Sequence, residues 1–186
     1  ETVRLDPAKT GDALELLHRL LQQLLKAGSQ VQVTDKAAHQ WVVITLLGRV
    51  RKPAHRFELN DQHGNKVSLS SFKGKKNVVL LFIPFAFTGT CTGELCAIRD
   101  DLAAFQNDNV QVIAVSCDSP YTQKVFAEQE GYKFPVLADF WPHGATAKAF
   151  GIFNEDLGCA MRGTFVIDKT GVVRWSVVNG LGDARN

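Results

Sequence analysis

Two patterns of apolar residues divide the chain into a short N-terminal part and a longer C-terminal part. Within residues 12–26, leucines recur at spacings of three and four, which predicts an amphipathic helix. Two short runs rich in Val, Ile and Thr follow at 30–34 and 41–46 and predict strands. We therefore expect residues 1–48 to form a small α+β extension of unknown role, joined to the rest by the basic segment 49–52.

From residue 53 onward, apolar runs of strand length alternate with stretches of helical periodicity. The run 77–84 is continuously apolar, as expected of a central strand that is buried on both faces. A helix is predicted over 91–106, because its apolar positions again step by three and four. The other predicted elements are strands at 57–59, 66–69, 110–116, 134–137, 164–168 and 172–177 and helices at 121–130 and 145–150. This alternation predicts an α/β layered fold with a mixed sheet in residues 53–186.

Composition and charge narrow the possible partners. Hydrophobic residues make up 45% of the 186 residues, and the formal net charge is only +2, with both signs interspersed. We therefore expect neither a nucleic-acid nor a membrane partner. No apolar run approaches the roughly 18 residues that a membrane-spanning helix needs. The sequence opens with Glu1 and has no signal-peptide pattern there, which leaves a removed leader open.

The four cysteines carry most of the chemical signal. No two of them have two residues between them, which is the spacing of zinc knuckles and of thioredoxin-type redox pairs. We therefore expect no metal site. Segment 84–91 leaves the predicted central strand, turns at Gly89 and brings Cys91 to the start of a helix. Free N–H groups there favour the nucleophilic thiolate. Thr88 can supply a hydroxyl that orients an oxygen substrate, and Pro84, which lacks an N–H, can limit the access of water.

These residues fill the pattern PxxxTxxC, and at this point the sequence resembles the peroxiredoxins. Segments 87–95, 139–144 and 162–168 are similar to the AhpE-like one-cysteine peroxiredoxins. The resemblance implies a thioredoxin-like three-layer sandwich in residues 53–186 and no metal, haem or flavin cofactor. It implies a thiol-dependent peroxidase that reduces hydrogen peroxide and organic hydroperoxides. Members of the family continue into a further helix, which we expect to lie beyond Asn186.

The resemblance also assigns roles to individual residues. It makes Cys91 the peroxidatic cysteine, Thr88 a hydrogen-bonding partner of the peroxide and Pro84 a shield of the pocket. Arg162 becomes the cation that stabilises the thiolate and the transition state. Composition alone would leave it one basic residue among 21. Glu94, one turn after Cys91, is expected to orient neighbouring polar groups.

Cys96 is the candidate resolving cysteine. Its position five residues after Cys91 resembles the peroxiredoxin Q, or bacterioferritin-comigratory, subgroup. Five residues of helix rise about 7.5 Å and rotate about 140°, so the two sulfurs cannot bond until the first turns unwind. Cys159, in an expected loop, stays open as another resolving residue, whereas Cys117 is expected in the core. The resemblance further implies a thioredoxin-like or mycoredoxin-like reductant, a homodimer and a cytoplasmic location.

Two alternative functions remain at this stage. A thiol–disulfide oxidoreductase shares the expected fold, but its chemistry uses two cysteines separated by two residues, which this chain lacks. A non-catalytic interaction module could also retain the fold and use its N-terminal part for binding. Peroxide consumption, insulin reduction and the effect of Cys91→Ser separate these functions.

Overall fold

A computed structural model describes residues 2–5, 31–34, 42–45 and 52–183, with side chains from residue 52 onward. The helix predicted at 12–26 lies outside these residues, as does most of the basic segment 49–52. Among the described residues, no helix is both long and apolar enough to cross a lipid bilayer.

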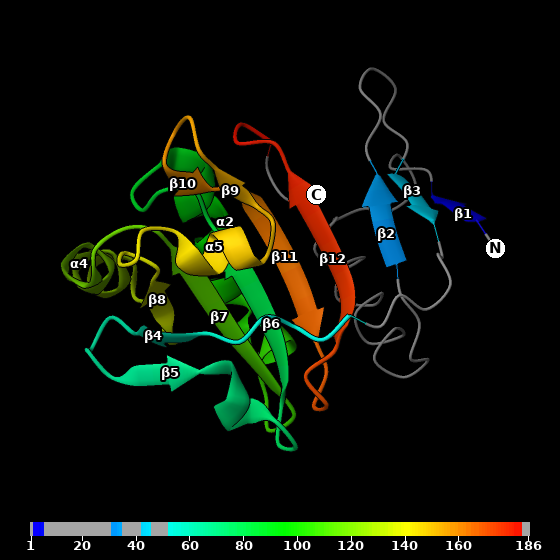
Figure 1. The fold of residues 1–186 in the computed structure, drawn as a ribbon, viewed down its shortest axis with the longest axis horizontal. Helices are drawn as coiled ribbons and strands as arrows, with labels where there is room; N and C mark the ends of the chain where they lie inside the picture. Colours follow the sequence, from blue (N-terminus) through cyan, green and yellow to red (C-terminus); the bar gives the residue numbers. More distant parts are fainter. Residues whose placement is uncertain (1, 6–30, 35–41, 46–51, 184–186) are drawn as a thin grey trace.

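Seven strands from the C-terminal part build a mixed sheet (Figure 1). In spatial order they are β12 (Val173–Asn179), β11 (Arg162–Ile167), β6 (Asn77–Phe82), β7 (Val110–Ser116), β8 (Val136–Ala138), β4 (Glu58–Asn60) and β5 (Lys66–Ser68). Strands β6, β7 and β8 run parallel, and β11 lies antiparallel to β6. The carboxyl ends of the three parallel strands therefore meet at one edge, where ligand sites form in open α/β sheets.

The N-terminal strands extend this sheet beyond β12. Strand β2 (Val31–Thr34) pairs in parallel with β12, and β3 (Val42–Thr45) and β1 (Thr2–Leu5) follow outward. Both strands predicted in this part are confirmed, while β1 was not predicted. The division into a 1–48 extension and a 53–186 domain stays a prediction.

Helices cover both faces of the central sheet and complete three layers. Alternate residues of β6 point to opposite faces, so each face has its own apolar core. One face packs against α2 (Gly89–Asp100), α3 (Leu102–Phe105) and α4 (Pro120–Glu130). The other face packs against α5 (Ala145–Ala149) and the 3₁₀ helix Leu69–Phe72. The expected α/β three-layer sandwich is confirmed.

Most predicted elements of this domain are confirmed, with two corrections. The helix expected over 91–106 begins earlier, at Gly89, and is interrupted at Asp101, whose backbone has φ −120° and ψ 37°. Aspartate has a low helix propensity, so the interruption carries little cost there. Cys159 does not lie in a loop, because strand β10 (Cys159–Ala160) pairs with β9 (Phe153–Asn154), and neither strand was predicted.

The turn between β11 and β12 depends on one carboxylate. Asp168 Oδ1 accepts the N–H groups of Thr170 (2.9 Å) and Val172 (3.0 Å), and Oδ2 accepts Arg174 Nε (2.6 Å). Burial alone would raise the pKa of Asp168, but hydrogen bonds from Thr170, Val172 and Arg174 outweigh it and lower that pKa. The stabilisation is therefore present above the pKa of an unfolded aspartate and is lost as pH falls through the lower folded value.

We expect Asp168→Ala to lower the free energy of unfolding by about 1–3 kcal/mol at pH 7, because the partly buried donors of Val172 and Arg174 lose their acceptor. The difference from the unsubstituted protein should begin to shrink at about pH 4, where the unfolded carboxylate takes up its proton, and should vanish as pH falls through the lower folded pKa of Asp168. Urea unfolding at pH 7 and pH 3 measures both effects. Asp156→Ala, at an exposed position, is the control and should change stability little. An equal loss in both variants would contradict the role of Asp168.

Candidate active site

Cys91 lies at the carboxyl edge of the sheet, where β6 leads through a short loop into α2. It is the third residue of that helix, and its side chain is completely buried. Thr88 occupies the N-cap position with extended backbone angles, φ −82° and ψ 142°. The first N–H groups of a helix have no acceptor within it, so the start of α2 favours negative charge beside the sulfur.

Arg162 approaches the same sulfur from β11. Strand alternation turns Arg162 toward the α2 face of the sheet, while Phe165 joins the opposite core. Arg162 is only 1% exposed, and its Nη1 donates to Cys91 Sγ at 3.5 Å and to Glu94 Oε2 at 2.5 Å. Its Nη2 donates to the carbonyl oxygen of Leu181 at 2.9 Å. Three residues predicted for the site, Cys91, Glu94 and Arg162, therefore lie together.

The charges at this site support one another. Burial disfavours the charged form of Arg162, but the Glu94 carboxylate and the Cys91 sulfur reverse this effect and raise the pKa of the guanidinium. Arg162 therefore stays positively charged at any physiological pH. A fixed positive charge 3.5 Å from a buried sulfur stabilises the thiolate far more than it would in bulk water.

The loop before α2 has a strained backbone. Phe87 adopts φ 62°, a left-handed conformation that costs an L-residue about 1–2 kcal/mol. Its ring packs against Phe126, with centroids 4.9 Å apart, and Thr88 Oγ1 donates to the carbonyl oxygen of Phe85 at 3.1 Å. Pro84 is buried and Thr88 is exposed. Because the Thr88 hydroxyl donates within the loop, its oxygen is left to accept a hydrogen bond from a substrate.

Asp118 also belongs to this edge, and sequence reasoning missed it. Its Oδ2 accepts the N–H of Ala86 in the loop at 2.8 Å. The residue follows β7, the parallel neighbour of β6, so its place after a predicted buried strand was the available signal. A carboxylate one strand away thus holds the backbone that leads to Cys91.

Cys96 lies apart from Cys91 on the intact helix α2. Its Sγ donates to Glu130 Oε2 at 3.4 Å and lies 3.9 Å from Tyr132 Oη, near the end of α4. Both cysteines are free thiols. The geometric expectation that an intact helix keeps the two sulfurs from bonding agrees with this arrangement.

Burial raises the pKa of the other two cysteines, Cys117 and Cys159. Burial, with a smaller contribution from Asp139, raises the pKa of Cys117 to about 12, which agrees with its expected place in the core. Burial also raises the pKa of Cys159, with smaller contributions from Asp118 and Cys91. Cys159 is completely buried in β10. Both side chains therefore remain thiols at neutral pH and are poor nucleophiles.

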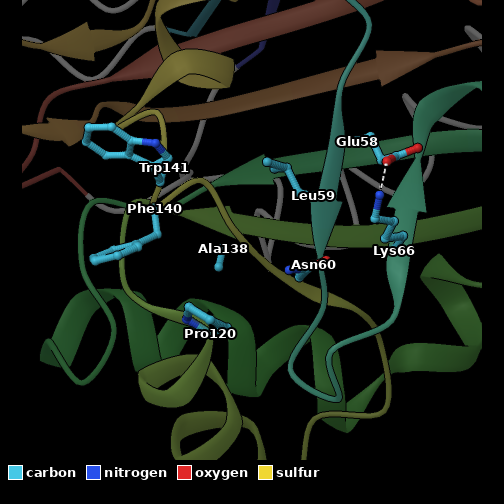
Figure 2. A pocket seen from close by; sticks show the side chains of 8 residues that line it. All are labelled: Glu58, Leu59, Asn60, Lys66, Pro120, Ala138, Phe140 and Trp141. Atoms are coloured by element: carbon cyan, nitrogen blue, oxygen red, sulfur yellow. Dashed lines mark hydrogen bonds and ion pairs between the residues drawn. The ribbon is translucent and has the colours of Figure 1, made fainter.

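One cavity lies at the same sheet edge, beside the β4–β5 hairpin (Figure 2). It has a volume of about 290 Å³ and is lined by Glu58, Leu59, Asn60, Lys66, Pro120, Ala138, Phe140 and Trp141. Figure 2 shows the two aromatic side chains on one side and the Glu58–Lys66 ion pair, 2.9 Å long, on the other. Cys91 does not line this cavity. Within the described part of the chain, no three His, Cys, Asp or Glu side chains cluster as metal ligands would.

The AhpC/TSA family matches residues 50–176 of this sequence. The chain belongs to this family of peroxiredoxins. It is 48% identical over 130 residues to alkyl hydroperoxide reductase E of Mycobacterium tuberculosis (strain ATCC 25618 / H37Rv), an alignment that covers 70% of this chain and 85% of that protein. The chloroplastic 2-Cys peroxiredoxin BAS1 of Arabidopsis thaliana is 35% identical over 133 residues, covering 68% of this chain and 49% of that protein.

Solved structures agree with this family. Peroxidoxin BcpB from Mycobacterium tuberculosis superposes with a TM-score of 0.64 at 32% identity, over 70% of this chain and 87% of that one. AhpC from Enterococcus faecalis gives a TM-score of 0.66 at 32% identity, over 73% and 84% of the two chains. The peroxiredoxin described here is therefore a thiol-dependent peroxidase with a thioredoxin-like fold. Neither a thiol–disulfide oxidoreductase nor a non-catalytic module is favoured.

Proposed function

We propose that this peroxiredoxin reduces hydrogen peroxide and organic hydroperoxides with Cys91 as the attacking residue. The observation that carries the proposal is the buried guanidinium of Arg162, 3.5 Å from the Cys91 sulfur at the start of a helix. A thiolate is the nucleophilic form of cysteine, and this arrangement favours it by charge and by hydrogen bonding.

In the proposed step, the Cys91 sulfur attacks one peroxide oxygen. An S–O bond forms as the O–O bond breaks, and the departing oxygen takes a proton and leaves as water or an alcohol. The sulfur is oxidised to a sulfenic acid, and the peroxide is reduced. Arg162 donates to the charge that develops on the oxygens. Thr88 orients the peroxide, Pro84 shields the sulfur from water and Glu94 holds the guanidinium in place.

The second step in this proposal is resolution by Cys96. Its thiol attacks the sulfenic sulfur of Cys91, a disulfide forms and water leaves. The start of α2 must unwind first, and opening of a helix end is an ordinary local fluctuation. A thioredoxin-like or mycoredoxin-like dithiol protein then reduces the disulfide. This cycle needs a reducing compartment, so we also propose a cytoplasmic location.

Mixing the reduced protein with a series of excess concentrations of hydrogen peroxide, or of an alkyl hydroperoxide, tests the first step. We expect the Cys91 thiol to disappear in a single rapid phase whose rate rises linearly with peroxide concentration. Rapid quenching and peptide mass spectrometry identify the oxidised residue. Oxidation that falls first on Cys96, or no oxidation at all, would contradict the proposal.

A sample oxidised with one equivalent of hydrogen peroxide tests resolution by Cys96. We expect the mass to fall by two hydrogen atoms and a peptide to appear in which Cys91 and Cys96 are joined. Cys117 and Cys159 should stay unmodified, because burial raises the pKa of both thiols. In Cys96→Ser the sulfenic acid should persist. A persistent sulfenic acid in the unsubstituted protein, with Cys96 free, would refute this second step while leaving the first intact.

We further propose that the protein acts as a homodimer, with residues 1–48 as an accessory unit outside the peroxidase domain. Large apolar side chains exposed beside the reaction edge, such as Tyr121 and Trp141 at 81% each, support a subunit contact. Sedimentation equilibrium tests the dimer, and a monomer at micromolar concentration would argue against it.

A further inference from the structure

Asp118 joins the end of β7 to the loop that precedes Cys91. Its Oδ2 accepts two hydrogen bonds, from the N–H of Ala86 at 2.8 Å and from the hydroxyl of Ser116 at 2.6 Å. Ala86 is 32 residues away in the sequence, so this bond ties together two elements that only the sheet makes neighbours.

A buried network fixes the direction of this carboxylate. Ser116 Oγ accepts Gln123 Nε2 at 2.5 Å and the N–H of Asp118 at 3.2 Å. Ser116 and Gln123 are both completely buried. The hydroxyl of Ser116 therefore accepts two hydrogen bonds and donates its own hydrogen to Asp118. The carboxylate is thus oriented by a hydrogen-bond network whose side chains, Ser116 and Gln123, are out of contact with solvent.

The loop that Asp118 holds contains a strained residue, which requires stabilising contacts. Phe87, the residue after Ala86, has the left-handed backbone, φ 62°, which an L-residue adopts only when its surroundings impose it. The hydrogen bond from Ala86 to Asp118 fixes the loop one residue before the strained Phe87. The contact between the rings of Phe87 and Phe126 fixes Phe87 itself. The loop then ends at Thr88, the N-cap of α2, so its shape sets where that hydroxyl and the first helical N–H groups point.

We propose that Asp118 is a positioning residue for the peroxide reaction. It acts through Ala86, fixing the 84–88 loop so that Thr88 and the start of α2 face the oxygens of a peroxide at Cys91. The inference rests on the proposed chemistry of Cys91. The function of Asp118 requires a hydrogen-bond acceptor at Oδ2 rather than a negative charge, because both of its partners here are neutral donors.

Two rate constants of Cys91 test the role of Asp118 in the full-length protein. The first is oxidation by hydrogen peroxide, which needs both a thiolate and an oriented substrate. The second is alkylation by iodoacetamide at the same pH, which needs the thiolate and access to it but no peroxide-orienting groups. The ratio of the two rate constants separates the orientation of the peroxide from the ionisation of Cys91 and from the access of reagents to its sulfur.

In Asp118→Ala, we expect the peroxide rate constant to fall about tenfold or more, since small displacements of orienting groups carry costs of that size. Alkylation should stay within about threefold of the unsubstituted protein, because Arg162 and the helix are retained. Asp118→Asn keeps an acceptor oxygen and should restore the peroxide rate to within about threefold. Should Asp118→Ala not fold, Ser116→Ala replaces it, and we expect a selective fall of about threefold or more.

Asp139→Ala is the matched control. Asp139 is a buried carboxylate at the end of β8 and accepts two N–H groups, from Thr146 at 2.9 Å and Ala147 at 2.8 Å, but it binds α5 rather than the loop. This variant should lose stability and keep the ratio of the two rates. Equal loss in both aspartate variants, an unchanged ratio in Asp118→Ala or an Asp118→Asn as slow as Asp118→Ala would overturn the inference. Absence of Cys91 oxidation in the unsubstituted protein would instead overturn the proposed function.

Discussion

Replacing Cys91 with serine abolishes the peroxidase activity of this protein, with an expected fall of about a thousandfold or more in the rate of peroxide consumption. A serine hydroxyl remains protonated at neutral pH even beside a guanidinium, and oxygen is a far weaker nucleophile toward a peroxide than sulfur. The variant should fold, because the two side chains differ by one atom and the site already holds a cation and hydrogen-bond donors. Stopped-flow peroxide consumption with a thiol reductant measures the effect.

Cys96→Ser is the matched control for this prediction, since it makes the same substitution on the same helix. We expect it to retain the first oxidation step at an unchanged rate and to be slower only in turnover that depends on the disulfide. If Cys91→Ser keeps most of the activity, or if Cys96→Ser loses the first step, the assignment of the attacking sulfur is wrong.

The second large effect is expected at Arg162. Arg162→Met replaces the guanidinium by a shorter unbranched side chain without charge or donors, and should lower the rate of Cys91 oxidation about a hundredfold. Alkylation by iodoacetamide should fall as well, because the thiolate loses its nearest positive charge. This joint fall distinguishes Arg162 from Asp118, whose loss should spare alkylation.

Arg162→Met should also destabilise the protein by about 3 kcal/mol, because the Glu94 carboxylate, whose side chain is 10% exposed, loses its guanidinium partner. The double variant Glu94→Gln/Arg162→Met removes this second charge and should recover much of the stability. It should not recover the reaction rate. Recovery of the rate along with stability would mean that Arg162 serves the fold alone.

Local patterns predicted most of the peroxidase domain. The apolar run 77–84 predicted β6, and the steps of three and four through Leu95 and Ile98 predicted α2. These patterns succeed because burial of one face, or of both, imposes a period on the sequence itself. The interruption at Asp101 and the two-residue strands β9 and β10 were missed, because such short features leave no period to detect.

The candidate site was predictable in part. The Pro84, Thr88 and Cys91 pattern lies within eight consecutive residues, so it could be read as one motif. Arg162 was selected by resemblance to a family and by nothing in its own surroundings along the chain. Asp118 was not selected at all, because its contact with Ala86 crosses between two strands.

By itself, the sequence determined the order of the longer strands and helices of the peroxidase domain and the placement of one cysteine at the start of a helix, since both follow from interactions between residues close in the chain. Only the tertiary structure decided which of 21 basic residues reaches the Cys91 sulfur, which carboxylate holds the loop and in which cysteines burial raises the thiol pKa. Charge pairing and burial depend on distances in space, and residues 71 positions apart become neighbours only when β11 pairs with β6.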